Sequence, residues 1–279
     1  PFEPRWRAMV CPLLSEPTPA PPAHWDVFDA SPTKADVAEY MLPYSRFAYY
    51  LQPDFLRVDI DEACFLVVGC GISALGEELY DEYSGRMREV MNVDISPYCV
   101  EHLRRRNSNR PRMRFAVEDM SRSSLPSRAY DVVVDKGVLD DVLAFNKCAA
   151  NGEFASETFD AGERSACAMV WEVRRVLVPT GGVYLIASIH GPSRLGPLLQ
   201  SEILGFDSVE HFELDTGEVG HHLFVCRTGS FLSSTYEATF EHYVADVLHK
   251  KYTEVMPLLT EDREAAVMAA FARRSSSNA

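Results

Sequence analysis

The residues most able to do chemistry are two glycines and two aspartates at even spacing along the chain. Gly69 and Gly71 follow an apolar run, where glycines let the backbone turn tightly and approach a ligand closely. Asp94 comes 25 residues after Gly69, and Asp119 another 25 residues later. An acid at the first position can accept both hydroxyls of a ribose, and an acid at the second could reach an adenine amino group. The spacing indicates a nucleoside site.

Each feature also has a plainer interpretation. The glycines could form a strand-to-helix turn without a ligand, and a single aspartate is more often a helix cap or a turn residue. A dehydrogenase is disfavoured because Ala74 stands where the G-x-G-x-x-G pattern needs its third glycine. Nucleotide hydrolysis is disfavoured because the P-loop pattern is missing.

The elements that position these residues follow a strand-helix alternation from about residue 64, which is typical of a parallel sheet built from β-α-β units. Expected strands cover 64–68, 90–94, 113–117, 130–135 and 182–189, with a closing hairpin at 209–214 and 222–226. Expected helices cover 75–83, 97–106, 137–145 and 164–177. The polar segment 146–162 is expected to be a long loop, which is usually functional or mobile.

The C-terminal part has a different character. An apolar face at helical spacing predicts a helix that carries Phe240, Tyr243, Val244, Val247 and Leu248. A second, Ala-rich helix is expected near 264–273. These helices could pack on the domain or meet another protein.

Composition narrows the function classes. The 279 residues carry 27 basic and 41 acidic side chains, a net charge of −14, which disfavours nucleic-acid binding and suits a small ligand or a basic protein. Seven cysteines without a C-x-x-C pair favour a reducing compartment, and we expect the cytoplasm. No apolar run approaches the ~18 residues that span a bilayer, so no membrane contact is expected. The chain begins with Pro1, which leaves open a removed leader or an upstream domain.

Four motifs carry a family resemblance: G-C-G at 69–71, V-D-I-S at 93–96, E-D-M at 118–120 and D-K-G-V-L-D at 135–140. Together they resemble the seven-strand, class I S-adenosylmethionine-dependent methyltransferases, and within them the eukaryotic methyltransferase-like enzymes that modify elongation factor 1-alpha. The resemblance covers about residues 24–228. It implies a Rossmann-like α/β fold, in which a mostly parallel seven-stranded sheet has helices on both faces.

The resemblance also implies roles for individual residues. S-adenosyl-L-methionine would be the cofactor and S-adenosyl-L-homocysteine the product. The cofactor-binding residues would be Trp25, Tyr40, Gly69, Gly71, Asp94, Ile95, Asp119, Met120, Asp135 and Lys136. Asp135 would orient the amino-acid end of the cofactor or face the acceptor amine, and is the candidate catalytic residue. Lys136 would pair with the cofactor carboxylate or hold its loop.

Some positions depart from the family pattern. Tyr40 stands where the family usually has Trp, Asp29 replaces a usual Tyr, and Val138 replaces Thr. The Asn-Pro-Pro-Tyr type motif used to methylate adenine, cytosine or glutamine amino groups is absent after the fourth strand. The resemblance implies methyl transfer to another amine, most simply a lysine on elongation factor 1-alpha or another basic protein.

Three other functions stay open. The chain could methylate a small molecule, could be an aminopropyltransferase of the spermidine-synthase type, or could be a degenerate scaffold. His221 and His222 are expected to be merely exposed rather than metal ligands. The arginines at 104–106 are expected to form a solvated helix end that complements the helix dipole.

The expected organisation has three parts. Residues 1–23 form a disordered, Pro-rich leader, 24–228 the methyltransferase domain, and 229–279 a C-terminal helical extension.

Overall fold

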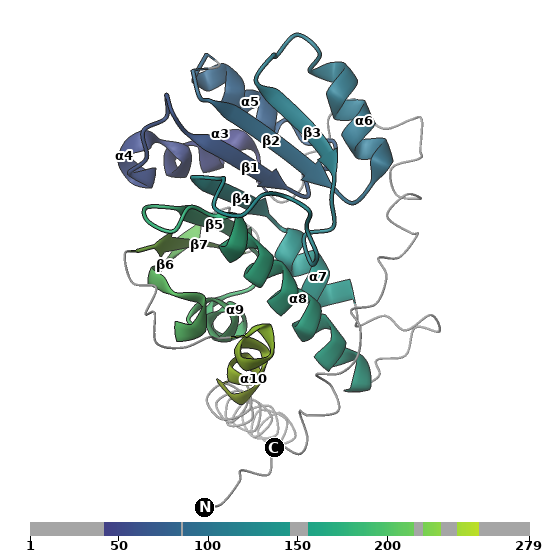
Figure 1. Ribbon diagram of the computed structural model, residues 1–279, viewed down its shortest axis with the longest axis vertical. Coiled ribbons are helices and arrows are strands. Elements are labelled where there is room, and N and C mark those ends of the chain that lie inside the picture. The colour runs from purple at the N-terminus through teal and green to yellow at the C-terminus, as the bar shows by residue number, and fades with distance from the viewer. Residues whose placement is uncertain (1–41, 85, 146–155, 215–219, 230–238, 251–279) are drawn as a thin grey trace, which may run out of the picture.

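The computed structural model describes residues 42–84, 86–145, 156–214, 220–229 and 239–250. Its centre is one seven-stranded sheet with the order β3-β2-β1-β4-β5-β7-β6 (Figure 1). The strands are β1 (Cys64–Val68), β2 (Glu89–Asp94), β3 (Met113–Val117), β4 (Val132–Lys136), β5 (Val183–Ser188), β6 (Phe206–Leu214) and β7 (His221–Thr228). All neighbours pair in parallel except β7, which is antiparallel to both β5 and β6. The predicted fold class is confirmed.

Helices cover both faces of the sheet. One face carries α3 (Tyr44–Phe47), η2 (Ala48–Leu51), α4 (Pro53–Leu56), α5 (Leu75–Glu82) and α6 (Pro97–Arg106). The other carries α7 (Val138–Phe145), α8 (Ser156–Val176), α9 (Pro192–Leu199), η3 (Glu202–Leu204) and α10 (Phe240–Lys250). Strand residues alternate between the two cores because successive side chains of a strand point to opposite faces. Leu66 and Val68 belong to the second core, whereas Phe65 and Val67 belong to the first.

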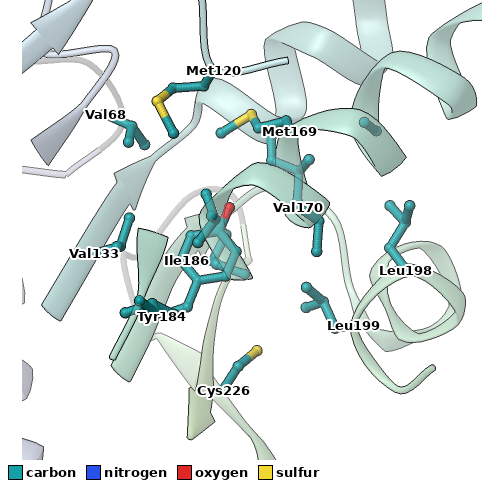
Figure 2. Close-up of a cluster of buried hydrophobic side chains, with 14 of the residues drawn as sticks. Val68, Met120, Val133, Met169, Val170, Tyr184, Ile186, Leu198, Leu199 and Cys226 are labelled. Carbon is teal, nitrogen blue, oxygen red and sulfur yellow. The ribbon is translucent and has the colours of Figure 1, made fainter. Parts of the chain in front are cut away.

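The core beneath α8 and α9 is built from both sheet and helix residues. Figure 2 shows Tyr184, Ile186 and Cys226 projecting from the sheet on the same side as Leu198 and Leu199 of α9. Tyr184 and Cys226 are fully buried. This packing fixes the distance between the central strands and the helices that follow β4 and β5.

The predicted C-terminal helix is confirmed as α10, with Tyr243, Val244 and Val247 buried on its apolar face. The ring of Tyr243 stacks on Trp171 of α8, with ring centroids 5.8 Å apart, and its hydroxyl donates to the Leu198 carbonyl at 2.8 Å. This helix packs back on the sheet domain. The expected second helix near 264–273 and the leader at 1–23 lie outside the described residues, and the boundary at 228 stays a prediction.

Several elements differ from expectation: β6 begins at Phe206 rather than at 209, β7 extends to Thr228, and the helices α3, η2, α4 and η3 have no predicted counterpart. α8 begins at Ser156, eight residues before the predicted start, so the expected loop at 146–162 is partly helical. The fourth strand begins at Val132, because Tyr130 makes only an isolated bridge with Leu177. α9 was not predicted, since Pro192 and Pro197 read as breakers; Pro192 stands in the first turn, where its missing N–H costs nothing.

No helix within the described ranges has the length and apolar character needed to cross a membrane.

Candidate cofactor site

The glycine turn after β1 is shaped by two residues with positive φ. Gly69 has φ +54°, and a Cβ there would lie 2.1 Å from Cγ2 of Val138, so only glycine lets α7 approach this closely. Gly71 has φ +49°, but no heavy atom of the described residues lies within 4 Å of the position that its Cβ would take. Gly71 thus leaves backbone open to a ligand, whereas Gly69 serves packing.

A third glycine, Gly76, lies two residues after position 74, where the G-x-G-x-x-G pattern has its third glycine. A Cβ on Gly76, in α5, would stand 2.1 Å from Oδ1 of the buried Asn92 in β2. Gly76 therefore gives the close helix-strand packing that the third glycine of G-x-G-x-x-G supplies. The spacing of the motif places this packing role at position 74, which is an alanine in this chain.

Asp94 ties the glycine turn to the next helix. Its Oδ2 accepts from the Gly71 backbone N–H at 2.8 Å, and its Oδ1 accepts from the Ser96 N–H at 2.9 Å. Ser96 in turn caps α6, because its hydroxyl accepts from the Cys99 N–H at 3.4 Å. The Asp94 side chain is partly exposed at the end of β2. Ile95 follows it and is half-buried.

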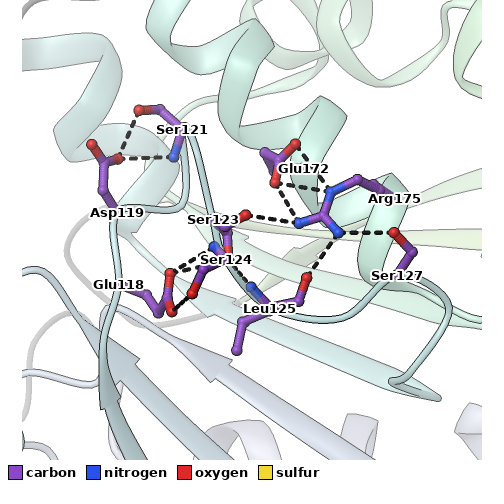
Figure 3. A network of polar contacts seen from close by, with 9 residues as sticks. All are labelled: Glu118, Asp119, Ser121, Ser123, Ser124, Leu125, Ser127, Glu172 and Arg175. Carbon is purple, nitrogen blue, oxygen red and sulfur yellow. Dashed lines mark hydrogen bonds and ion pairs between the residues drawn. The ribbon is translucent and has the colours of Figure 1, made fainter.

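Asp119 and Met120 lie on a loop after β3 that is held by polar contacts (Figure 3). Oδ1 of Asp119 accepts from the Ser121 N–H at 2.9 Å, and Oδ2 accepts from Arg122 at 3.0 Å. Met120 is buried in the core beneath. The Glu118 N–H donates to the Asp94 carbonyl at 3.0 Å, which joins this loop to the end of β2.

The same loop is anchored from α8. Arg175 donates to the carbonyls of Ser123 at 3.0 Å and Leu125 at 2.8 Å, and pairs with Glu172 (Figure 3). A planar guanidinium can satisfy several carbonyls at once. The position of the Asp119 loop is therefore set by a helix on the second face of the sheet.

Asp135 was expected to face the ligand, but its carboxylate turns into the core. The side chain is fully buried; Tyr184 donates its hydroxyl to Oδ2 at 2.9 Å, and the Val138 N–H donates to Oδ1 at 2.8 Å. Burial raises the pKa of Asp135 to about 7, and the charge of Asp140 adds to that rise. Asp135 is thus placed to hold the turn at Gly137 and Val138.

Lys136 and Asp140 brace the same turn from two sides. Nζ of the buried Lys136 donates to the Leu42 carbonyl at 3.1 Å, which joins β4 to the start of the described chain. The buried Asp140 accepts from the hydroxyl of Ser188 and from the Ile189 N–H at 2.8 Å. Asp141, beside it, is half-buried, and desolvation raises its pKa to about 6. Trp25 and Tyr40 lie outside the described residues.

The histidines are more structured than expected. His222 is half-buried rather than merely exposed, and its Nδ1 lies 2.9 Å from Nε2 of His211 on β6. Burial, followed by the neighbouring His222, lowers the pKa of His211. Among the described residues, no three or more His, Cys, Asp or Glu side chains are grouped so that they could hold a metal ion.

Comparisons with known proteins show the family to which the chain belongs. Residues 65–151 match the family described as "Methyltransferase domain". The chain is 30% identical over 212 residues to the mouse protein "EEF1A lysine methyltransferase 4", covering 75% of this chain and 76% of that protein. It is 39% identical over 125 residues to bovine "eEF1A lysine and N-terminal methyltransferase", but that match covers 44% of this chain and only 16% of the bovine protein. A methyltransferase structure from Methanosarcina mazei aligns with TM-score 0.46 at 14% identity, over 64% of this chain and 98% of that chain.

A seven-stranded sheet with a glycine turn after β1 and an acid at the end of β2 defines a nucleoside-binding protein of the Rossmann-like class. The chain belongs to the class I S-adenosylmethionine-dependent methyltransferases, in the group that includes the eEF1A lysine methyltransferases. Its cofactor is S-adenosyl-L-methionine.

Proposed function

We propose that this methyltransferase transfers its methyl group to a lysine of a basic protein, most simply elongation factor 1-alpha. The observation that carries the proposal is the match to mouse "EEF1A lysine methyltransferase 4", which spans 76% of that protein. The net charge of −14 favours a basic partner, since opposite charge speeds and orients association.

We propose that the cofactor lies over Gly71, with the ribose hydroxyls on Asp94 and the adenosine beside Ile95. The open space at Gly71 and the position of the Asp94 carboxylate beside the Gly71 N–H support this placement. Asp119 and Met120 would border the adenine. In our proposal Trp25 and Tyr40 close over the site, and Lys136 holds the chain that leads to them through the Leu42 carbonyl.

The proposed roles at the fourth strand differ from the first expectation. Since the carboxylate of Asp135 contacts Tyr184 and the backbone of Val138, we assign it to positioning the turn rather than to contact with the acceptor. Asp140 has the same kind of role at Ser188.

Methyl transfer from the cofactor to an amine requires no covalent intermediate on the protein. Bound S-adenosylmethionine supplies a methyl group on a sulfonium. A lysine acceptor, with a pKa of ~10.4 in water, must lose a proton before it can attack. A site that excludes water lowers that pKa, and correct positioning supplies much of the rate.

We further propose that the protein acts in the cytoplasm. The five cysteines in the described part of the chain, Cys64, Cys70, Cys99, Cys167 and Cys226, are all buried, and none of them is in a disulfide. Cysteines that form no disulfide suit a reducing compartment.

The test is transfer of label from tritiated S-adenosylmethionine to a hypomethylated eukaryotic lysate and to purified, unmethylated elongation factor 1-alpha. Asp94→Ala should abolish labelling, whereas Asp59→Ala, which changes an exposed aspartate away from the glycine turn, should not. Labelled lysine in one basic protein supports the proposal. Label that enters only small molecules contradicts the protein substrate, and absence of both label and S-adenosylhomocysteine binding indicates a scaffold.

A further inference from the structure

The three arginines that end α6 do not form one solvated group. Arg104 and Arg105 pair with Glu101 of their own helix at 2.6 and 2.7 Å, and their side chains are 50% and 78% exposed. The Arg106 side chain is only 18% exposed and pairs with Glu77 of α5 at 3.1 Å. The expectation of a solvated helix end is therefore wrong for Arg106.

Arg106 reaches the backbone of the glycine turn. Its Nη1 donates to the Ile72 carbonyl at 3.2 Å and its Nη2 to the Ser73 carbonyl at 2.9 Å. The turn from Gly69 to α5 is thus contacted by a side chain that is more than 30 residues away in sequence.

These two carbonyls lie just outside the hydrogen-bond ladder of α5. The Ala74 carbonyl accepts from the Glu78 N–H at 2.9 Å, so Ile72 and Ser73 precede the first helical acceptor. A guanidinium has a planar fork of donors that can serve both carbonyls and Glu77 together, which a lysine ammonium cannot reproduce. Glu77 also offsets the positive charge, which would otherwise be unfavourable near the N-terminus of α5.

The other side of the turn is held by β2. The Cys70 N–H donates to the Val93 carbonyl at 3.0 Å, and the Gly71 N–H donates to Asp94. Arg106 therefore completes a frame of hydrogen bonds around Gly71. In this frame the backbone N–H groups of the turn donate to β2, and its backbone carbonyls accept from Arg106 of α6. Arg110 extends this frame, because it pairs with Asp81 at the other end of α5.

We propose that Arg106 is a positioning residue that keeps the glycine turn in its cofactor-binding shape. The inference rests on the proposed placement of the cofactor at Gly71. A turn that is ordered in advance does not lose conformational entropy on binding, so Arg106 acts on cofactor affinity. It does not act on the rate of methyl transfer once the cofactor is bound.

The test compares Arg106→Met, Arg106→Lys and the matched control Arg105→Met on the same helix. S-adenosylhomocysteine binding is measured by calorimetry, which requires no acceptor and so separates this inference from the lysine proposal. We expect R106M to weaken binding about 10-fold or more, since two carbonyls lose their donor. R106K should lie between R106M and the wild type, and R105M should bind like the wild type.

Melting temperatures and kinetics separate positioning from general damage. With the acceptor found in the labelling experiment, R106M should raise KM for S-adenosylmethionine and leave kcat within about twofold. If R106M does not fold, the test is made with R106K. Weaker S-adenosylhomocysteine binding by R106K than by the wild type, at an unchanged melting temperature, supports the inference. Wild-type affinity in R106K and R106M, or an equal loss in R105M, overturns it, as does a fall in kcat at unchanged KM.

Discussion

The hydroxyl of Tyr184 donates to the Asp135 carboxylate at 2.9 Å, and both side chains are fully buried. Tyr184 lies on β5 in register with Val133 of β4, so its hydroxyl reaches diagonally to Asp135, two residues further along β4. Together with the bond from the Val138 N–H, this bond sets the turn that places Val138 against Gly69. The D-K-G-V-L-D motif at 135–140 thus positions the glycine turn through buried contacts in the core.

This buried acid predicts a pH-dependent stability. Because the pKa of Asp135 is raised from 3.8 to about 7, its contribution to folding is fully present below about pH 3.8 and is lost as pH rises through about 7. The shift corresponds to roughly 4 kcal/mol. Asp135→Asn should remove this decline, so that urea unfolding at pH 4.5 to 8 shows a flatter curve than the wild type. The control Asp59→Asn should keep the wild-type dependence of stability on pH. If the stability of Asp135→Asn falls with pH as steeply as that of the wild type, the raised pKa is not that of Asp135.

Gly71 and Gly181 form a matched pair. Both have positive φ, and no heavy atom of the described residues lies within 4 Å of a Cβ built on either. Replacement by alanine should cost about 1–2 kcal/mol at each site from backbone strain. Only Gly71→Ala should also weaken S-adenosylhomocysteine binding, since only Gly71 lies at the proposed cofactor site. Calorimetry and thermal melting check both effects, and equal binding by the two variants would remove Gly71 from the site.

The His211–His222 pair predicts a titration that NMR can follow. His222→Ala removes both the ring that helps bury His211 and its charge, so the pKa of His211 should rise toward its usual value. His221→Ala, which changes the adjacent residue on the opposite face of β7, should leave the pKa of His211 unchanged. A pKa of His211 that responds equally to both variants would show that the pair is not the cause.

The packing of α10 predicts a large cost for its central aromatic residue. Tyr243→Ala should destabilise the protein by about 3–5 kcal/mol, because it empties a fully buried space beside Trp171. Tyr243→Phe should cost only about 1 kcal/mol for the lost hydrogen bond to Leu198. Denaturant unfolding measures both. Wild-type stability in Tyr243→Ala would mean that α10 is detached from the domain in solution.

Much of the fold follows from local sequence. β1, β3 and α6 have the predicted bounds. β1 is a continuous apolar run that ends at Gly69, and Ser96 and Pro97 provide the cap and the first helical residue of α6. The apolar face of α10 is likewise a local pattern. These signals depend only on residues that are close together in the sequence, and so they can be recognised without the structure.

The sequence by itself determined the seven strands and their order along the chain, the glycine turn and the acid at the end of β2. Only the tertiary structure decided which way Asp135 points, that Gly76 supplies the third close contact, and that Arg106 differs from Arg104 and Arg105. Each depends on partners 16 or more residues away, Tyr184, Asn92 and the carbonyls of the glycine turn. Pairing of β4 with β5, packing of α5 on β2, and the approach of α6 to the glycine turn bring these partners together, and no spacing within a single element encodes them.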